Sequence, residues 1–398
     1  MKNILFDILI FVICIGCSNR SAVDLPEHIK NQDLENLTIY QADVQPNQTI
    51  QLIREQAFGN SEDVLIGNPS QLEADRSGRV YIGDSQQKSI HVFQPDGNYL
   101  SSIGREGQGP GEFQWIGNMQ ILSDELFIYD PNSHRLNVFR IPENSNTAPE
   151  FLHSVVISGD NFEGIPEANF MSPRLYRIRN DGSLILFSRN SIFQYRQDPE
   201  FQGVTRYYLV NMEDETSIDT IFEMDMPEHI VTEWFTIPAP FNARGLMALS
   251  SDDRIFSVWT DDILIKVHSP DGVYERSFYY PFVNHDLNRE DAINSMDDHE
   301  QLQKAVRSME LPKTWPALDR MFIDDKDRIW IATIVDDLDI FEWWVMNEEG
   351  ELLTRFNWPR SKQIVKVKNG KLYARKTEEE TGLEEIVRYD IKMKTVFK

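Results

Sequence analysis

One short phrase recurs six times along this chain of 398 residues, and it limits the possible folds more than any other feature. Each copy has a turn rich in Asp, Gly, Asn or Ser, often a basic residue, and then aliphatic and aromatic residues. Such turns favour tight hairpins, and such runs favour strands that pack on both faces. The copies are DRSGRVYIGD, LSDELFIYD, RNDGSLILFS, SSDDRIFSVW, DDKDRIWIAT and KNGKLYARK, whose first strand residues are Val80, Leu126, Leu184, Ile255, Ile329 and Leu372.

The spacing of the copies predicts the architecture. Successive first strand residues lie 46, 58, 71, 74 and 43 residues apart. The shortest spacings match the roughly 40–50 residues of a four-stranded propeller blade, and the longer ones indicate insertions. We therefore expect an all-β fold, a six-bladed β-propeller of four-stranded antiparallel blades.

The first two copies continue in the same pattern, since Asp84 and Asp130 end their strands and a basic residue follows each at the fourth position. Residues 68–113 resemble an NHL repeat, with the strand–turn–strand core, the Asp96-Gly97 hairpin and a trailing G-x-x-G-x-G-P-G-x-F. Over about residues 68–395 the chain is similar to lipoprotein-type six-bladed propellers of Bacteroidota-like bacteria. This resemblance implies that Asp84 and Asp130 cap turns. It implies no particular activity, because propellers host many unrelated functions.

A propeller must join its last blade to its first, since an open ring leaves unpaired strand edges. The sixth copy lies in a stretch that supplies three strands, and Gln48 to Phe58 alternates between apolar and polar residues. We expect this early segment to be the fourth strand of the last blade. In the alternative it packs across the outside as an isolated strand.

Residues 288–310, between the fourth and fifth copies, carry apolar residues at helical spacing. Asn288 is a suitable N-cap for this helix, and Leu311-Pro312 is a suitable end. We expect a helical insertion between blades 4 and 5 that lies over one face of the propeller. It either shapes a pocket or docks a partner, or it only covers an exposed edge.

The N-terminal residues 1–17 read MKNILFDILIFVICIGC, a short basic start and an apolar run too short to span a bilayer. The Gly16-Cys17 ending resembles a bacterial lipobox, which implies a lipoprotein signal peptide over residues 1–17 and lipidation of Cys17. We expect residues 18–46 to form a flexible tether and residues 47–398 to form the propeller. The protein would then be lipid-anchored in the cell envelope, on the periplasmic or outer-membrane face. The alternative is an ordinary secretory signal peptide that is cleaved nearby.

The formal net charge of −25 is spread along the chain. Such a surface repels phosphate backbones, so we expect no nucleic-acid partner. It is typical of a solubility-optimised or salt-adapted protein, and it also suits a cationic partner. The two cysteines, Cys14 and Cys17, both lie at the N-terminus, so we expect no disulfide in the propeller. Contact with a membrane is expected through the lipid anchor only.

No catalytic residue is predicted. The sequence has no G-x-S-x-G, H-E-x-x-H or P-loop motif, and its eight histidines show no metal-ligand spacing. Carboxylates are abundant, so calcium is the one candidate cofactor, although the sequence identifies no set of metal ligands. Lactonase-like six-bladed enzymes, a group with the expected fold, hold such an ion in the central channel with Glu, Asn and Asp.

The candidate ligand-binding residues are Arg105, Trp115, Arg174, Arg244 and Trp315. Arg105 and Trp115 lie in or beside the glycine-rich run 104–113, a connection between blades that reaches the face where propellers commonly bind ligands. The other three precede or begin expected inner strands, which line the channel. Arginines there suit an anionic ligand. In the alternative, all five residues serve packing or salt bridges.

These features together predict an envelope-anchored, non-enzymatic module that binds an unknown protein or a small-molecule or carbohydrate ligand. The alternative is a lactonase-like or sugar-processing hydrolase or lyase with a divalent cation in the central channel. Three or more converging Asp, Glu, Asn or His side chains on the inner strands would favour the enzyme. A channel lined by aromatic residues or arginine, without such a cluster, would favour binding.

Overall fold

The computed structural model describes residues 25–59, 63–157, 169–198, 200–211, 218–233, 236–296, 299–378 and 382–396. The chain divides into two compact units, Met1–Asp33 and Leu34–Lys398. The described part of the first unit contains the short helix α1 (Glu27–Lys30). The predicted signal peptide and the lipidation of Cys17 lie outside the described residues.

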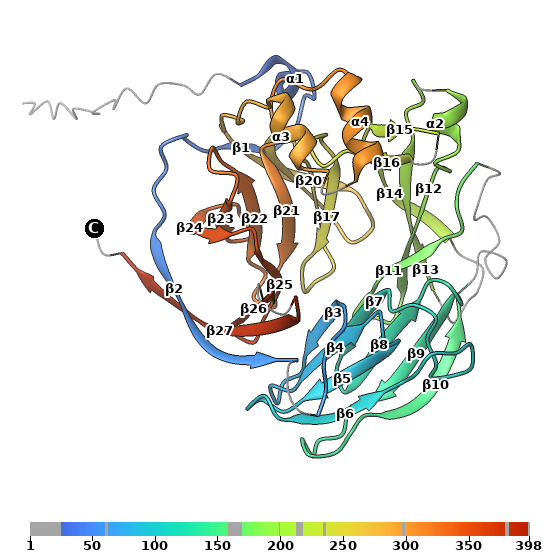
Figure 1. The fold of residues 1–398 in the computed structure, drawn as a ribbon. Coiled ribbons are helices and arrows are strands. Elements are labelled where there is room, and N and C mark those ends of the chain that lie inside the picture. Colours follow the sequence, from blue (N-terminus) through green and yellow to red (C-terminus); the bar gives the residue numbers. More distant parts are fainter. Residues whose placement is uncertain are drawn as a thin grey trace, which may run out of the picture. The chain divides into compact units, whose positions relative to one another are not determined.

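Six sheets, each with a four-stranded antiparallel core, form most of the second unit (Figure 1). Blade 1 contains β3 (Pro69–Ala74), β4 (Val80–Asp84), β5 (Ser89–Phe93) and β6 (Tyr99–Ile103). Blade 2 contains β7 (Asn118–Leu122), β8 (Glu125–Asp130), β9 (Arg135–Arg140) and β10 (Glu150–Val156). Blade 3 contains β11 (Arg174–Ile178), β12 (Leu184–Arg189), β13 (Val204–Val210) and β14 (Ile218–Asp225).

The other three blades follow in chain order. Blade 4 contains β17 (Gly245–Leu249), β18 (Ile255–Trp259), β19 (Ile263–His268) and β20 (Tyr274–Tyr280). Blade 5 contains β21 (Leu318–Ile323), β22 (Ile329–Ile334), β23 (Ile340–Met346) and β24 (Leu352–Pro359). Blade 6 contains β25 (Lys362–Lys368), β26 (Lys371–Thr377), β27 (Glu384–Thr395) and β2 (Gln48–Phe58). The second unit is therefore a six-bladed β-propeller, as the repeat predicted.

The recurring phrase forms the second strand of every blade, and neighbouring residues of the phrase pack in opposite directions. Val80 belongs to an apolar cluster shared with blade 6, whereas Tyr81 belongs to a cluster shared with blade 2. Side chains alternate between the faces of a strand, so an uninterrupted apolar strand can join two neighbours at once. In the preceding turns, Gly182 has φ 82° and Asp253 has φ 64°, which explains the Gly and Asp content of the phrase.

Strand β2 closes the ring, as predicted. It pairs antiparallel with β27 from Gln48–Thr395 to Phe58–Ile386, and it is the outermost strand of blade 6. Figure 1 shows these two strands, blue and red, side by side although they come from opposite ends of the sequence. The alternative of an isolated outer strand is wrong, because β2 is paired from Gln48 to Phe58 with one bulge between Arg54 and Gln56.

The predicted tether, residues 18–46, contains a strand of the propeller. β1 (Leu37–Ile39) pairs in parallel with β20 and extends blade 4 to five strands. Tyr40 follows it and stacks on Tyr280 with 4.5 Å between the ring centroids. The ordered propeller therefore begins before residue 47.

Asp84 and Asp130 cap turns, as the resemblance implied. The buried Asp84 carboxylate accepts hydrogen bonds from the backbone N–H groups of Gly67 and Gln86, with N–O distances of 2.7 and 2.8 Å. Asp130 makes equivalent contacts with backbone N–H groups of its own turn and of the connection before its blade. Burial alone would raise the pKa of Asp84, but the His91 ring 3.6 Å away and hydrogen bonds from the backbone hold the pKa well below its ordinary value.

The insertion between blades 4 and 5 contains two helices, α3 (Arg289–Asn294) and α4 (Glu300–Ser308), where the sequence predicted one. Asn288 caps α3 as expected, since its side chain accepts a hydrogen bond from the Asp291 backbone N–H. Ser295 is the C-cap residue of α3, and its hydroxyl donates to the Ala292 carbonyl at 2.8 Å. Nearby short elements are α2 (Gln194–Gln197), β15 (His229–Val231) and β16 (Thr236–Pro238).

Candidate functional site

A cavity of about 860 Å³ lies among the first strands of the six blades. β3, β7, β11, β17, β21 and β25 all contribute to its lining. These are the innermost strands of their sheets, so the cavity is the central channel of the propeller. A volume of this size is typical of small-molecule sites, which span roughly 300–1,000 Å³.

Equivalent residues of the six inner strands form one level of the cavity wall, which we call the inner ring. Each member pairs with the second strand residue of the recurring phrase in its blade. The members all line the cavity. They are Glu73, Gln120, Arg177, Ala248, Phe322 and Lys366. The ring therefore combines one carboxylate and two cations with neutral residues.

Glu73 of blade 1 forms ion pairs with Lys366 and Lys368 of blade 6. The Glu73 side chain is 3% exposed, and its Oε2 atom lies 2.9 Å from Lys368 Nζ. Burial alone would raise the pKa of Glu73, but the charges and hydrogen bonds of the two lysines lower it below its ordinary value. Glu73 is therefore ionised at neutral pH and holds two cations at the wall.

A second shared carboxylate lies nearer the start of the inner strands. The Asp319 side chain pairs with Arg244 Nη2 at 2.7 Å and with Arg320 Nε at 3.1 Å. Arg244 was predicted as a ligand-binding residue from its place before an inner strand, and it does line the cavity. Its guanidinium also donates to the Asp319 carbonyl at 2.8 Å, which fixes its position.

Arg177 of blade 3 differs from these cations. It lines the cavity, and its Nε atom is buried without a hydrogen-bond partner among the described residues. The neighbouring blade 2 offers amides rather than carboxylates, and both are already bound. Gln120 donates to the Ile178 carbonyl at 2.7 Å, and Asn118 donates to the Tyr176 carbonyl. Arg177 thus lines the cavity with a donor that the described residues leave unpaired.

The cavity lining carries more positive than negative charge, although the whole chain has a formal net charge of −25. Its cations are Arg177, Arg244, Arg320, Lys366 and Lys368, and its carboxylates are Glu73, Asp319, Asp324 and Asp325. The buried Asp324 pairs at 2.7 Å with Arg328, which is not a lining residue, and this pair neutralises its charge. The cavity is therefore locally cationic in an acidic protein.

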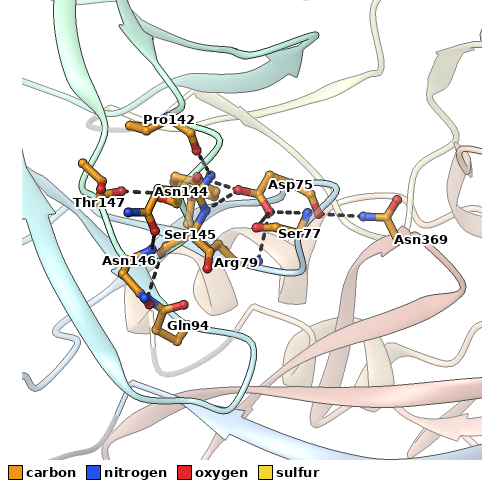
Figure 2. A network of polar contacts seen from close by, with 11 residues as sticks. Asp75, Ser77, Arg79, Gln94, Pro142, Asn144, Ser145, Asn146, Thr147 and Asn369 are labelled. Carbon is orange, nitrogen blue, oxygen red and sulfur yellow. Dashed lines mark hydrogen bonds and ion pairs between the residues drawn. The ribbon is translucent and has the colours of Figure 1, made fainter.

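Another buried charged pair joins blades rather than serving the cavity. Figure 2 shows Arg79, whose Nε donates to Asp75 at 2.6 Å and whose other nitrogens donate to the carbonyls of Pro142 and Thr147. Asn369 of blade 6 donates to the Asp75 carbonyl at 2.9 Å. The network connects blades 6, 1 and 2, and its donors and acceptors are mutually satisfied, so we assign it to the stability of the propeller.

The other predicted site residues lie away from the cavity lining. Arg105 is 80% exposed and pairs with Glu112 at 2.7 Å. Trp115 is exposed, with the Lys88 ammonium 4.8 Å from its ring centroid. Arg174 begins β11, and Trp315 is buried in an apolar cluster with residues of α3 and α4. The structure does not bring these four residues together.

Sequence reasoning missed Arg177, Arg320 and the Glu73 group with its two lysines. A signal for the inner ring exists, because each member lies six or seven residues before the first strand residue of its phrase. This narrow range of offsets results from the short turn between the two paired strands. Which residues of neighbouring blades form ion pairs cannot be found from such a signal in the sequence.

The enzyme alternative requires a set of metal ligands in the cavity. Within the described residues, no group of three or more His, Cys, Asp or Glu side chains is placed to hold a metal ion. The predicted calcium site thus has no ligand set in this part of the chain. The charged groups that exceed their partners in the cavity lining are arginines and lysines.

Comparison with known proteins agrees with the fold. Residues 58–143 match the model of a family described as "6-bladed beta-propeller". No curated protein sequence matches the chain. Among solved structures, a member of the DUF4221 family from Bacteroides vulgatus is similar with a TM-score of 0.52 and 13% identity, over 88% of this chain and 100% of that one. At this identity the likeness concerns the fold alone.

Two further structures are similar at lower scores. A presumed exported protein from Bacteroides fragilis has a TM-score of 0.46 and 11% identity, covering 89% of this chain and 99% of that one. Regucalcin from Agrobacterium tumefaciens, named as a calcium-binding protein, has a TM-score of 0.40 and 10% identity, covering 91% and 98%. In the part of the chain that the structure describes, no helix is both long and apolar enough to cross a bilayer.

Proposed function

We propose that this protein is a binding module whose central cavity holds a small anionic ligand. The observation that carries the proposal is Arg177, a cavity-lining arginine whose buried Nε atom has no hydrogen-bond partner among the described residues. An unsatisfied buried donor costs about 1–3 kcal/mol, and more when it is charged. An anionic ligand would supply the missing acceptor.

The rest of the wall supports the same ligand class. Glu73 and Asp319 each serve two cations, so neither can neutralise its neighbours fully. Carboxylates and phosphates accept charge-assisted hydrogen bonds from the planar guanidinium group, often two at a time.

Isothermal titration calorimetry with citrate as an anionic probe and glucose as a neutral one tests the proposal. We expect citrate to bind and glucose to give no heat. Arg177→Gln should weaken citrate binding roughly 10–100-fold, since hydrogen bonds to charged groups contribute about 1.5–3 kcal/mol. Arg105→Gln is the matched control, because Arg105 is an exposed arginine outside the cavity lining. Citrate binding that is absent, or equally reduced in both variants, would contradict the proposal.

The hydrolase or lyase alternative requires a divalent cation in the same channel. Thermal unfolding with and without millimolar calcium separates the two functions, because a ligand that binds only the folded state raises the Tm. A rise with calcium would favour the enzyme. An unchanged Tm, together with citrate binding, would favour the binding module.

We further propose that the protein is an NHL-type envelope lipoprotein, anchored through Cys17. Two features of the sequence support this: the Gly16-Cys17 ending and the NHL-like pattern of residues 68–113. Mass spectrometry of the mature N-terminus should detect a diacylated or triacylated Cys17. An unmodified N-terminus further along the chain would contradict the anchor and leave the cavity proposal intact.

A further inference from the structure

We infer that the ligand of the central cavity is an elongated molecule with an apolar middle and a negative group at each end, lying along the channel. The inference rests on the proposed anion-binding function and adds the shape of the ligand. Its basis is the level at which each cation stands on the cavity wall.

We call the position of the inner ring along the channel the lower level. It contains Arg177 and Lys366, which belong to the inner ring. Both pair with the second strand residue of the phrase in their blades, Ile185 and Tyr373. Lys368 pairs with Lys371 and so lies two residues nearer the turn. Lys366 and Lys368 share the carboxylate of Glu73, whereas the Nε atom of Arg177 has no hydrogen-bond partner among the described residues. Asp324 and Asp325 also line this end of the cavity, and Arg328 pairs with Asp324, so the cations exceed the carboxylates by one.

The upper level lies nearer the start of the inner strands and contains Arg320 and Arg244. Arg320 pairs with Ala332, the fourth strand residue of its phrase. Arg244 stands further along, directly before Gly245, which pairs with Trp259, the fifth strand residue of its phrase. These two cations share the single carboxylate of Asp319. A strand rises about 3.3 Å per residue, so Arg320 stands about 7 Å from the level of Arg177.

Between the two charged levels the wall is apolar. In five blades, the inner-strand residue between the two levels pairs with the third strand residue of the phrase and lines the cavity. The residues are Leu72, Met119, Met247, Met321 and Ile364. This band cannot solvate a charge, whereas it suits the methylene chain of a ligand. A compact anion would reach one charged level only.

Aliphatic dicarboxylates have the required chemistry and provide a length series from malonate to sebacate. Calorimetry on the wild-type protein should give the tightest binding at an intermediate length, with carboxylates about 7 Å apart or slightly more. Adipate should bind at least tenfold more tightly than hexanoate, which has an equally long chain and one carboxylate. The neutral diol of the same length should not bind.

Two variants assign the ends of the ligand to the two levels. Arg177→Gln and Arg320→Gln should each reduce adipate affinity about tenfold or more, to the level of hexanoate, whereas Arg105→Gln should leave it unchanged. The affinity for hexanoate should fall strongly in only one of the two cavity variants. Thermal unfolding of each variant verifies that it is folded.

The outcomes separate this inference from the proposed function. If adipate and hexanoate bind equally, or malonate binds as tightly as the longer chains, the elongated dianion is wrong while anion binding stands. If neither the dicarboxylates nor citrate bind the wild-type protein, the proposed function itself fails. The length series needs no substitution, so it decides the question even if a variant does not fold.

Discussion

Glu73 of the first blade accepts a hydrogen bond from Lys368 of the last blade, with 2.9 Å between Oε2 and Nζ, although 295 positions separate the two residues. The contact lies at the inner edge of the junction that β2 and β27 complete at the outer edge. The ring is therefore closed twice, by backbone pairing outside and by an ion-pair cluster inside. The inner closure also sets the charge of the cavity.

Glu73→Gln should lower stability and raise anion affinity together. The substitution removes the carboxylate that two lysines share, and loss of one partner from a buried ion pair is destabilising. Because Lys366 and Lys368 are 31% and 21% exposed, we expect a loss of about 1–2 kcal/mol in the free energy of unfolding. Urea unfolding and citrate calorimetry measure the two effects. Glu106→Gln, at an exposed position, is the control. Unchanged stability would refute the inner closure.

The same pair predicts a dependence of stability on pH. The pKa of Glu73 is lower in the folded protein than in the unfolded chain, where it is about 4.3. The stabilisation is therefore complete above the unfolded value and is lost as the pH falls through the lower folded value. The unfolding free energies of the wild type and of Glu73→Gln should therefore converge as the pH falls below the unfolded pKa toward the lower folded pKa. A constant difference over this range would exclude Glu73 as the cause.

Trp315→Ala should destabilise the protein without changing the cavity. The Trp315 side chain is 5% exposed and packs in the apolar cluster of the helical insertion, 6.5 Å from Phe241 between ring centroids. Truncation of a buried tryptophan costs about 3–5 kcal/mol. Thermal unfolding should detect the loss, and citrate affinity of the folded variant should equal that of the wild type. Weaker citrate binding at unchanged Tm would instead support Trp315 as a ligand-binding residue.

Removal of β2 should prevent formation of a stable propeller. A chain that begins at Gly59 leaves the edge of β27 unpaired over ten residue pairs. Exposed edges of this length promote association between chains. Size-exclusion chromatography should show aggregates, whereas a chain that begins at Leu34 should elute as a folded species. A monomeric, cooperatively unfolding product from the shorter chain would contradict the closure by β2.

The repeated phrase made the propeller predictable, because each copy combines a tight turn with a strand that packs against both neighbouring blades. The closing strand was also predictable, since Gln48 to Phe58 alternates and the last blade lacked a strand. The helical insertion was placed correctly, but it contains two helices rather than one, and Ser295 is the C-cap residue of the first. Local pattern determined each of these elements.

The cavity was less predictable. Arg244 was identified from its place before an inner strand, whereas Arg177 was missed although it lies seven residues before Leu184, the offset shared by the inner ring. Arg105 and Trp115 were predicted because the glycine-rich run 104–113 is a connection between blades, and such connections reach the face where propellers commonly bind ligands. In the structure Arg105 pairs locally with Glu112, and Trp115 lies beside Lys88. Neither residue is part of the cavity lining.

The sequence by itself determined the number of blades, the place of the second strand in each, and the level at which every inner-ring residue stands. These properties depend on turn chemistry and on the alternation of side chains, which act over a few residues. Only the tertiary structure decided that Glu73 meets Lys366 and Lys368, that Asp319 is shared by two arginines, and that the Nε atom of Arg177 has no partner among the described residues. Charge balance in a cavity depends on which strands face each other after the ring closes, and that neighbourhood brings together residues far apart in the chain.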